Sequence, residues 1–366
     1  MKKNWLEIDE QGYAALAQRR EKGAVVAEVI SNAWDSGTER VEIRLTPVIG
    51  RPLVTVEVED WGEGFQDMAE SYTVFSASRR AGDVHKRGRF NRGEKDVLSI
   101  AEQAEIVSVG GTIQFDSGGR RKSKASRPKG TLFKGDLRMT REEYGEVLIF
   151  IERMIPPVET TVNGKPLARL KPEVYFEASL LTEVVDENGV LRRRVQKGVV
   201  EVYDCGGESG EILELGVPVV ECSMPYRINV LQKVPLNSDR DNVPPSYLKQ
   251  LQVTVLNHIH NRLDEDQAKQ AWVQEATADG SASKAAVESV FRKKFGELAV
   301  SATPNDPAAN AKAASQGYAV IQGGAMSSGQ WSNVKKHGLI VPASQAFPTP
   351  TAEQKAAVQR CPTCGR

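Results

Sequence analysis

The sequence has few cysteines and no long apolar run, and both absences limit what the protein can be. Only 4 of the 366 residues are cysteines, two of them at the C-terminus. The chain therefore does not look like a disulfide scaffold, and a reducing compartment is expected. No segment has the uninterrupted apolar length of a membrane span. The segment Met1–Asp9 carries basic residues without an apolar run behind them, which argues against a signal peptide. We expect a cytoplasmic globular protein.

The sequence also has no excess of one charge. Lys+Arg and Asp+Glu both number 48, so the overall charge predicts no polyanionic partner. The basic residues are nevertheless unevenly placed, and such runs are usually solvated loops, with nucleic-acid contact as the alternative. The two runs are Arg79, Arg80, Lys86, Arg87, Arg89, Arg92 and Lys95, and Arg120, Arg121, Lys122, Lys124, Arg127 and Lys129.

Two common signatures of phosphoryl-transfer proteins are missing. There is no Gly-x-x-x-x-Gly-Lys-Ser/Thr loop, which excludes a Walker-type nucleotide site, and there is no kinase-type His-Arg-Asp. The length of 366 residues suffices for two domains and a tail. With 40% hydrophobic and 26% charged residues, the composition is that of an ordinary globular protein.

What the sequence does contain is a row of polar side chains within an apolar helical pattern. Glu28, Asn32 and Asp35 stand at i, i+4 and i+7, so on a helix they project from one face. Aliphatic residues between positions 25 and 33 surround this row. An acid, an amide and a second acid beside buried aliphatic side chains are costly unless they hold a ligand. A solvated polar face is the alternative interpretation.

A second pattern follows the first along the chain. Residues 53–60 alternate like a strand that ends at Asp60, and Gly62 and Gly64 come directly after it. Glycines at such a position let the backbone approach a bound molecule closely. An ordinary turn is the alternative for this segment taken alone.

Together the two patterns resemble the first two motifs of the GHKL ATPase superfamily, Glu-x-x-x-Asn-Ala-x-Asp on a helix and Asp-x-Gly-x-Gly after a strand. This superfamily contains DNA gyrase B, the ninety-kilodalton heat-shock chaperones, sensor histidine kinases and the MutL mismatch-repair proteins. The resemblance implies an α+β fold, in which a Bergerat-type α/β sandwich that binds the nucleotide is followed by a mixed α/β transducer domain. It also implies ATP and Mg²⁺ as cofactors and hydrolysis of ATP to ADP and phosphate.

Two later segments resemble further motifs of the superfamily by their order. Gly88, Asn91 and Gly93 precede a predicted helix, where relatives carry a glycine-rich loop that holds phosphates. A helix N-terminus suits an anion because it presents unpaired N–H donors. Asn91 stands where the chaperones have a glycine, and asparagine tolerates left-handed backbone geometry. Lys95 either lies near phosphate or faces solvent. Thr131 matches the Gly-Thr that enters a strand near the adenine.

The segment Val234–Asp241 resembles a middle-domain segment of the heat-shock chaperones. In those proteins a Pro-Leu-Asn sequence is followed by an arginine that reaches the γ-phosphate. The resemblance makes Arg240 this arginine and Asn237 its supporting neighbour. A planar guanidinium suits the charge of a phosphoryl group. A polar turn before the next helix is the alternative.

The resemblance also implies a role for each residue of the first two motifs. Glu28 would orient or deprotonate the attacking water, and Asn32 would bind Mg²⁺ through its amide oxygen. Asp60 would accept a hydrogen bond from the adenine amino group. Asp35 would order the polar face. The backbone of Gly62 and Gly64 would pack on the base.

Composition shifts and proline pairs predict three regions. Pro156-Pro157 marks the end of an ATP-binding domain over 1–157, and an α/β transducer domain covers 158–265. Residues 266–366 are rich in Ala, Gln, Ser, Gly and Pro, so we expect a helical, poorly ordered C-terminal region. Within it, residues 300–355 are predicted to be loosely ordered, with small structured pieces near 317–321 and 338–341.

The C-terminal Cys361-Pro362-Thr363-Cys364 is half of a zinc knuckle, and structural zinc needs four ligands. Two chains could share one ion, a partner could complete the site, or the thiols of Cys361 and Cys364 bind no metal. Cys205 and Cys222 lie in predicted strands, where buried free thiols are common.

We therefore expect an ATP-dependent conformational switch that is chaperone-like and slowly hydrolyses Mg·ATP. A homodimer formed on ATP binding and an unknown protein client are the expected partners. The first alternative is a DNA-transaction ATPase subunit of the MutL or topoisomerase kind, in which the basic runs touch DNA. The second is an ATP-gated scaffold that does not hydrolyse ATP. A sensor kinase is disfavoured because no phospho-accepting helical module precedes the site.

Overall fold

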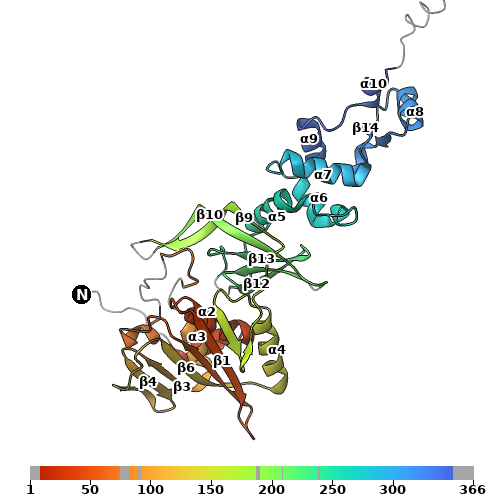
Figure 1. Ribbon diagram of the computed structural model, residues 1–366. Coiled ribbons are helices and arrows are strands. Elements are labelled where there is room, and N and C mark those ends of the chain that lie inside the picture. The colour runs from red at the N-terminus through yellow and green to blue at the C-terminus, as the bar shows by residue number, and fades with distance from the viewer. Residues whose placement is uncertain are drawn as a thin grey trace, which may run out of the picture. The chain divides into compact units, whose positions relative to one another are not determined.

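The computed structural model describes residues 9–74, 82–88, 92–186, 190–207, 209–237 and 240–348 (Figure 1). The chain divides into two compact units, Met1–Tyr247 and Leu248–Arg366. The predicted domain boundary after residue 157 falls inside the first unit, and the one after residue 265 falls inside the second. Among the described residues, no helix has both the length and the apolar character needed to cross a membrane.

An eight-stranded sheet forms one half of the first unit, with strand order β5-β4-β3-β6-β2-β1-β7-β8. All neighbours are antiparallel except β1 and β7. In β1 the alternating residues Val41, Ile43 and Leu45 are buried, as the sequence pattern predicts. The strands are β1 (Arg40–Pro47), β2 (Leu53–Asp60), β3 (Ala101–Ser108), β4 (Gly111–Asp116), β5 (Gly119–Ser123), β6 (Thr131–Arg138), β7 (Glu159–Val162) and β8 (Lys165–Pro166).

Helices pack against this sheet and complete a two-layer sandwich (Figure 1). The central helix, α2, is buried on most of its surface because Val25, Val29 and Ile30 join one core cluster with strand residues such as Ile43 and Phe133. A capping box, with Thr140 as N-cap, starts α4. The helices are α1 (Glu10–Ala17), α2 (Lys22–Trp34), the 3₁₀ turn η1 (Met68–Ser71), α3 (Gly93–Ile100) and α4 (Arg141–Glu152). The mixed α+β fold class is confirmed.

A five-stranded sheet follows in the first unit, in the order β12-β11-β13-β10-β9. Its long hairpin joins β9 (Val174–Val185) to β10 (Leu191–Asp204). The other strands are β11 (Gly210–Glu214), β12 (Val217–Cys222) and β13 (Tyr226–Val230). The sheet is joined to the segment that follows α4 by a backbone hydrogen bond of 2.8 Å from Ile155 to the Gly216 carbonyl. Glu211 of β11 also accepts from Arg153, the C-cap of α4, at 3.1 Å, and from Arg227 of β13 at 2.7 Å.

The second unit buries large side chains such as Trp272 and Leu256 in its N-terminal part and a cluster of small ones in its C-terminal part. Residues 300–348, which were expected to be loosely ordered, form a parallel strand pair with packed helices and a core of Val300, Ala309, Ala313 and Ala343. The many alanines of this segment made it look poorly ordered, because they give no strong hydrophobic pattern in the sequence. In the structure their small side chains let the elements pack closely. The elements are α5 (Pro245–Ile259), which spans the unit boundary, η2 (Gln267–Lys269), α6 (Ala271–Thr277), α7 (Lys284–Phe295), β14 (Ala299–Ser301), α8 (Pro307–Ser315), β15 (Ala319–Ile321), η3 (Gly323–Ala325), α9 (Ser328–Lys336) and α10 (Ala343–Ala346).

Candidate functional site

A cavity of about 540 Å³ in the first unit collects many of the residues predicted to bind nucleotide. Its walls come from α2, from the loop that follows β2, from η1, from residues 83–88, from the start of α3 and from the segment before α5. The predicted site residues on its walls are Glu28, Asn32, Gly64, Gly88, Gly93 and Arg240. Residues far apart in the sequence thus meet around one space.

Local structure explains how each wall is placed. Glu28 and Asn32 are one helical turn apart on α2 and so face the same side. Gly64 has φ of 69°, a left-handed conformation that favours glycine, and an added Cβ would lie 2.8 Å from the Gly130 carbonyl oxygen. Gly93 is the first residue of α3, so the N-terminal turn of that helix begins at the cavity. A Cβ on Gly93 would lie 2.6 Å from Oε2 of Glu28.

The carboxylate of Glu28 is fixed by hydrogen bonds from two arginines. Arg240 donates through one guanidinium nitrogen to both carboxylate oxygens, at 2.9 and 2.7 Å, and Arg20 donates to Oε1 at 2.8 Å. The Glu28 side chain is almost fully buried. Burial by itself raises the pKa of Glu28, but the charges of Arg240, Arg20 and Arg87 outweigh it, and the pKa is lowered. Glu28 is therefore held as a carboxylate.

A network behind Glu28 fixes Arg20 in turn. Asp96 of α3, which is 1% exposed, accepts from Arg20 at 2.7 Å, from Tyr13 at 2.8 Å and from Arg92 at 3.0 Å. Burial raises the pKa of the Tyr13 phenol, and its hydrogen bond to Asp96 raises it further. Sequence reasoning missed Arg20, Asp96 and Tyr13 because 76 to 83 residues separate the partners. No local spacing pattern signals such contacts.

Asp60 and Thr131 are near the cavity without forming its wall among the described residues. Asp60 is 4% exposed, and its Oδ1 accepts from the Ser36 hydroxyl at 2.9 Å and from the Gly62 N–H at 2.8 Å. The Thr131 hydroxyl is 2.9 Å from the Ser108 hydroxyl. The structure places the proposed adenine-binding acid in the layer beneath the glycine loop, where it orders the turn at Gly62.

The remaining predicted residues are spread around the cavity. Asp35 follows α2 as its C-cap and accepts at 2.9 Å from the Arg87 N–H. Lys95 is buried and donates to the Glu70 carbonyl at 2.7 Å, so it does not face solvent. The exposed Asn237 donates to Asp241 at 2.7 Å. The last predicted residues, Asn91, Cys361 and Cys364, lie outside the described part of the chain.

Charges of both signs line the cavity. The basic side chains of Lys86, Arg87, Arg92 and Arg240 suit a polyphosphate, while the amide oxygen of Asn32 is a hard ligand that suits Mg²⁺. Carboxylates on the cavity wall come from Glu63, Asp67, Glu70, Asp83 and Glu94. In the ranges that the structure describes, there is no group of three or more His, Cys, Asp or Glu residues arranged to hold a metal on its own.

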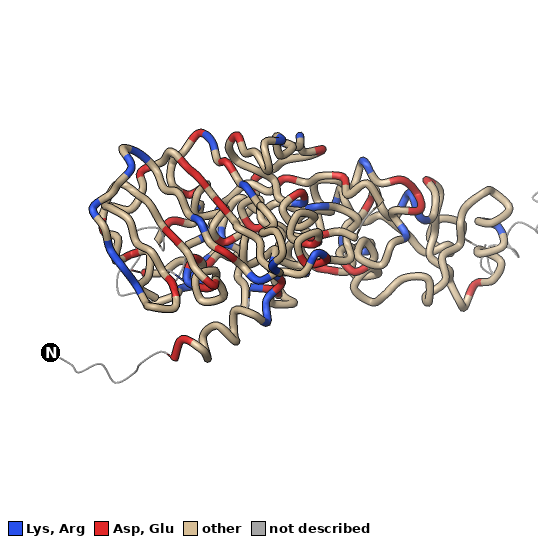
Figure 2. Tube along the Cα trace, turned by 90° about the horizontal axis from the view of Figure 1, so that it is seen from below, with Lys and Arg blue, Asp and Glu red and all other residues tan. Residues whose placement is uncertain are grey.

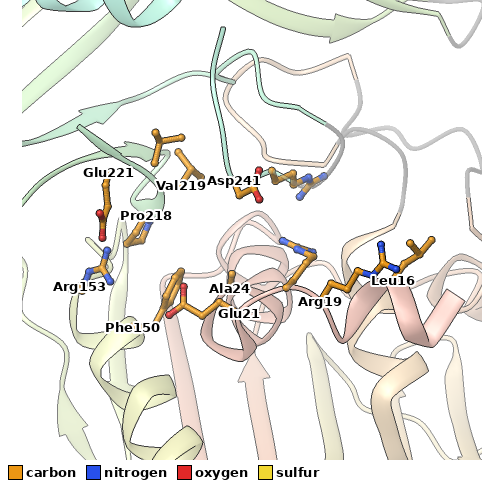
Figure 3. Close-up of a pocket in the computed structure, with 13 residues that line it drawn as sticks. Leu16, Arg19, Glu21, Ala24, Phe150, Arg153, Pro218, Val219, Glu221 and Asp241 are labelled. Carbon is orange, nitrogen blue, oxygen red and sulfur yellow. The ribbon is translucent and has the colours of Figure 1, made fainter. Parts of the chain in front are cut away.

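A second cavity of about 450 Å³ shares Arg240 with the first. Figure 3 shows its wall, to which α1 contributes Leu16, α4 contributes Phe150 and β12 contributes Glu221. Arg20, which holds Glu28, also lines this cavity. Arg240 is therefore in contact with both spaces, and Arg20 with the second.

Neither a protein-family model nor a curated protein matches the chain by sequence. Two solved structures of the ATPase region of topoisomerase II from Saccharomyces cerevisiae are similar to it in fold. The structure bound to ICRF-187 (dexrazoxane) has 8% sequence identity and a TM-score of 0.39, and the match covers 63% of this chain and 83% of that one. The other has 9% identity and a TM-score of 0.40, over 70% of this chain and 86% of that one. At this level of similarity, the function has to be argued from the site itself.

Proposed function

We propose that the protein binds Mg·ATP in the cavity around Glu28 and hydrolyses it slowly, as a chaperone-like conformational switch. The observation that carries this proposal is the contact of Arg240 with Glu28. A basic side chain from beyond the second sheet reaches a buried carboxylate on α2, at a cavity that also contains Asn32 and the start of α3. These are the groups that the motif resemblance assigns to water activation, to Mg²⁺ and to phosphate.

The cavity wall fits a nucleotide with its metal. Gly64 and Gly93 let the backbone pack closely against Gly130 and Glu28, where a side chain would clash. The first N–H groups of α3 and the nearby arginines are donors for phosphate oxygens. Asn32 would supply a neutral oxygen to Mg²⁺. Asp60 would accept a hydrogen bond from the adenine amino group, next to the turn at Gly62 that it orders. Thr131 would lie near the adenine as well. When bound, Mg²⁺ neutralises charge on the phosphates.

Glu28 is the group that would orient or deprotonate water. Its lowered pKa makes it a weak base while Arg240 and Arg20 are both bound to it. A γ-phosphate offers Arg240 a second anionic partner, and a shift of Arg240 toward it would raise the basicity of Glu28. In this mechanism the ATP state is linked to the position of the segment that carries Arg240.

The proposal is tested by separating binding from turnover. Glu28→Ala should bind Mg·ATP in calorimetry and lose most steady-state phosphate release, whereas Asp60→Asn should lose ATP affinity in a folded protein. Equal turnover by Glu28→Ala and the wild type would remove Glu28 from the chemistry. Unchanged affinity in Asp60→Asn would remove the adenine from this side of the cavity.

A DNA-transaction ATPase subunit is the second candidate, and the basic run over 120–129 favours it. A scaffold gated by ATP without hydrolysis is the third. We further propose that ATP binding brings two copies together in the cytoplasm, and that a protein client responds to the switch. Sedimentation with and without an ATP analogue tests the dimer. Pull-down with Glu28→Ala held in ATP tests for the client.

A further inference from the structure

The edge strand β5 carries an unusual concentration of positive charge. It is the outermost strand of the eight-stranded sheet, and all five of its residues are exposed. Its sequence, Gly-Arg-Arg-Lys-Ser, is followed by the exposed Lys124 and Lys129. In Figure 2 a run of blue lies at the end of the first unit where β4 and β5 form the sheet edge. We call this strip, from Arg120 to Lys129, the basic edge.

Most other basic groups on this sheet are neutralised by neighbouring acids. Arg44, Lys134 and Arg138, for example, form ion pairs with Glu57 or Glu102. On the basic edge, only Arg121 and Arg127 have a carboxylate partner within the described ranges. The positive charge of the other four basic side chains is therefore available to an external anion.

An aromatic ring lies under two of these side chains. The Arg120 guanidinium carbon is 3.6 Å from the centroid of the Tyr72 ring, and the Lys122 Nζ is 5.1 Å from it. Alternate residues of a strand point to one face, so Arg120 and Lys122 lie side by side on this ring. A guanidinium spread flat on an aromatic ring is held in place, and it still presents N–H donors at its rim.

Protection of the sheet edge is the simpler explanation for such charges, since edge strands often carry lysine to prevent pairing between molecules. The other edge strand of the same sheet, β8, has a single basic residue, Lys165, followed by a proline. The basic edge also continues past the end of β5 to Lys124 and Lys129, where no strand edge needs protection. Edge protection therefore accounts for only part of the charge.

We propose that the basic edge binds the sugar-phosphate backbone of nucleic acid. A line of unpaired cations fits an anion that repeats along a chain, and this electrostatic contact needs no particular base sequence. Directly after the strip, the Gly130 N–H donates to the Gly62 carbonyl at 3.0 Å, and the neighbouring Glu63 and Gly64 line the cavity around Glu28. The inference does not depend on ATP hydrolysis.

The test uses the full chain and a fluorescent 20-nucleotide strand, alone or as a duplex, in anisotropy titrations between 50 and 200 mM salt. The wild type should bind, with log K falling linearly as log salt concentration rises. In Lys122→Glu/Lys124→Glu, affinity should fall at least tenfold at the lowest salt. The slope should become shallower by about 0.7–0.9 for each phosphate that the variant no longer neutralises. The two forms of DNA show whether strandedness matters.

The matched control is Lys165→Glu/Lys171→Glu, which makes the same charge change at and near the opposite edge of the sheet. Both lysines are exposed. This control should bind within twofold of the wild type. Equal weakening in the two variants would mean that only net charge matters, and no binding by the wild type at 50 mM salt would also overturn the proposal. Binding to phosphatidylserine vesicles without binding to either DNA would assign the basic edge to a membrane surface instead.

Discussion

At position 28, a carboxylate is removed from water and must be compensated by other charges. Arg240 and Arg20 provide this compensation, and Asp96 balances Arg20 from the other side. A buried charge that loses its partner destabilises the fold, so each residue of this network of ion pairs depends on its neighbour. The same ion pairs hold the Glu28 carboxylate at the cavity. Residues outside the cavity that position Glu28 are therefore expected to affect the proposed hydrolysis of ATP.

Tyr13→Phe tests this positioning because it removes only a hydroxyl. The variant should lose about 1.5–3 kcal/mol of unfolding free energy, since a hydrogen bond to the charged Asp96 is removed. Its kcat should fall several-fold while its ATP affinity stays unchanged, because Tyr13 is not part of the cavity wall. Tyr175→Phe is the control, as this tyrosine is 74% exposed. If kcat is unaltered in Tyr13→Phe despite the expected drop in stability, the network is structural only.

The lowered pKa of Glu28 also predicts how stability depends on pH. A carboxyl with a lower pKa in the folded state stabilises the fold above its unfolded pKa of about 4.3, and this contribution is lost as the pH falls below that value. Urea unfolding at several pH values should show that wild type is more stable than Glu28→Gln at pH 7. The difference should shrink as the pH falls from about 4 toward 3. A constant difference would mean that the fold gains nothing from the charge of Glu28.

At the scale of single elements, the start of α3 is tied to Glu28. Gly93→Ala would put a methyl group 2.6 Å from the Glu28 carboxylate, so one of the two must move. ATP turnover should be lost in this variant. Gly145→Ala is the matched control in another helix, because a Cβ there meets no atom within 4 Å. It should stabilise the protein by about 0.5–1 kcal/mol and leave turnover unchanged. Similar ATP turnover in the two variants would argue against a functional role for the close contact between Gly93 and Glu28.

The elements that could be predicted from sequence are those with a local pattern. Alternation placed β1 and β2, and the apolar period placed α2, so Glu28 and Asn32 were correctly put on one face. Strands β5 and β11 could not be predicted because neither alternates between buried and exposed residues. All residues of β5 are exposed, and all residues of β11 are buried. The partners of Glu28 could not be predicted either, because Arg20 is fixed by tertiary contacts with Asp96.

At the scale of the whole first unit, several contacts join the second sheet to the rest of the unit, and two of them are ion pairs with a buried carboxylate. One is the cluster of Glu211 with Arg153 and Arg227 beside α4, and the other is the contact of Arg240 with Glu28. The first contains no group that lines the cavity around Glu28, so the proposed binding of nucleotide is expected to leave it unchanged. The second is made by a residue with φ of 60°, a strained conformation for arginine. This strained contact is the one that a γ-phosphate would compete for.

Competition between Glu28 and a γ-phosphate for Arg240 predicts a coupling free energy that thermal unfolding can measure. A non-hydrolysable ATP analogue should raise the melting temperature of the wild type more than ADP does at equal saturation, because only the analogue offers Arg240 a γ-phosphate. In Arg240→Ala this excess should vanish, while ADP binding changes little. A coupling of about 1–3 kcal/mol corresponds to an excess of several degrees for a unit of this size. Arg19→Ala is the control, since Arg19 lines the second cavity and has no ion pair within the described ranges. If Arg240→Ala and Arg19→Ala keep the same excess, Arg240 is only a structural partner of Glu28, and ATP does not act on the second sheet through it.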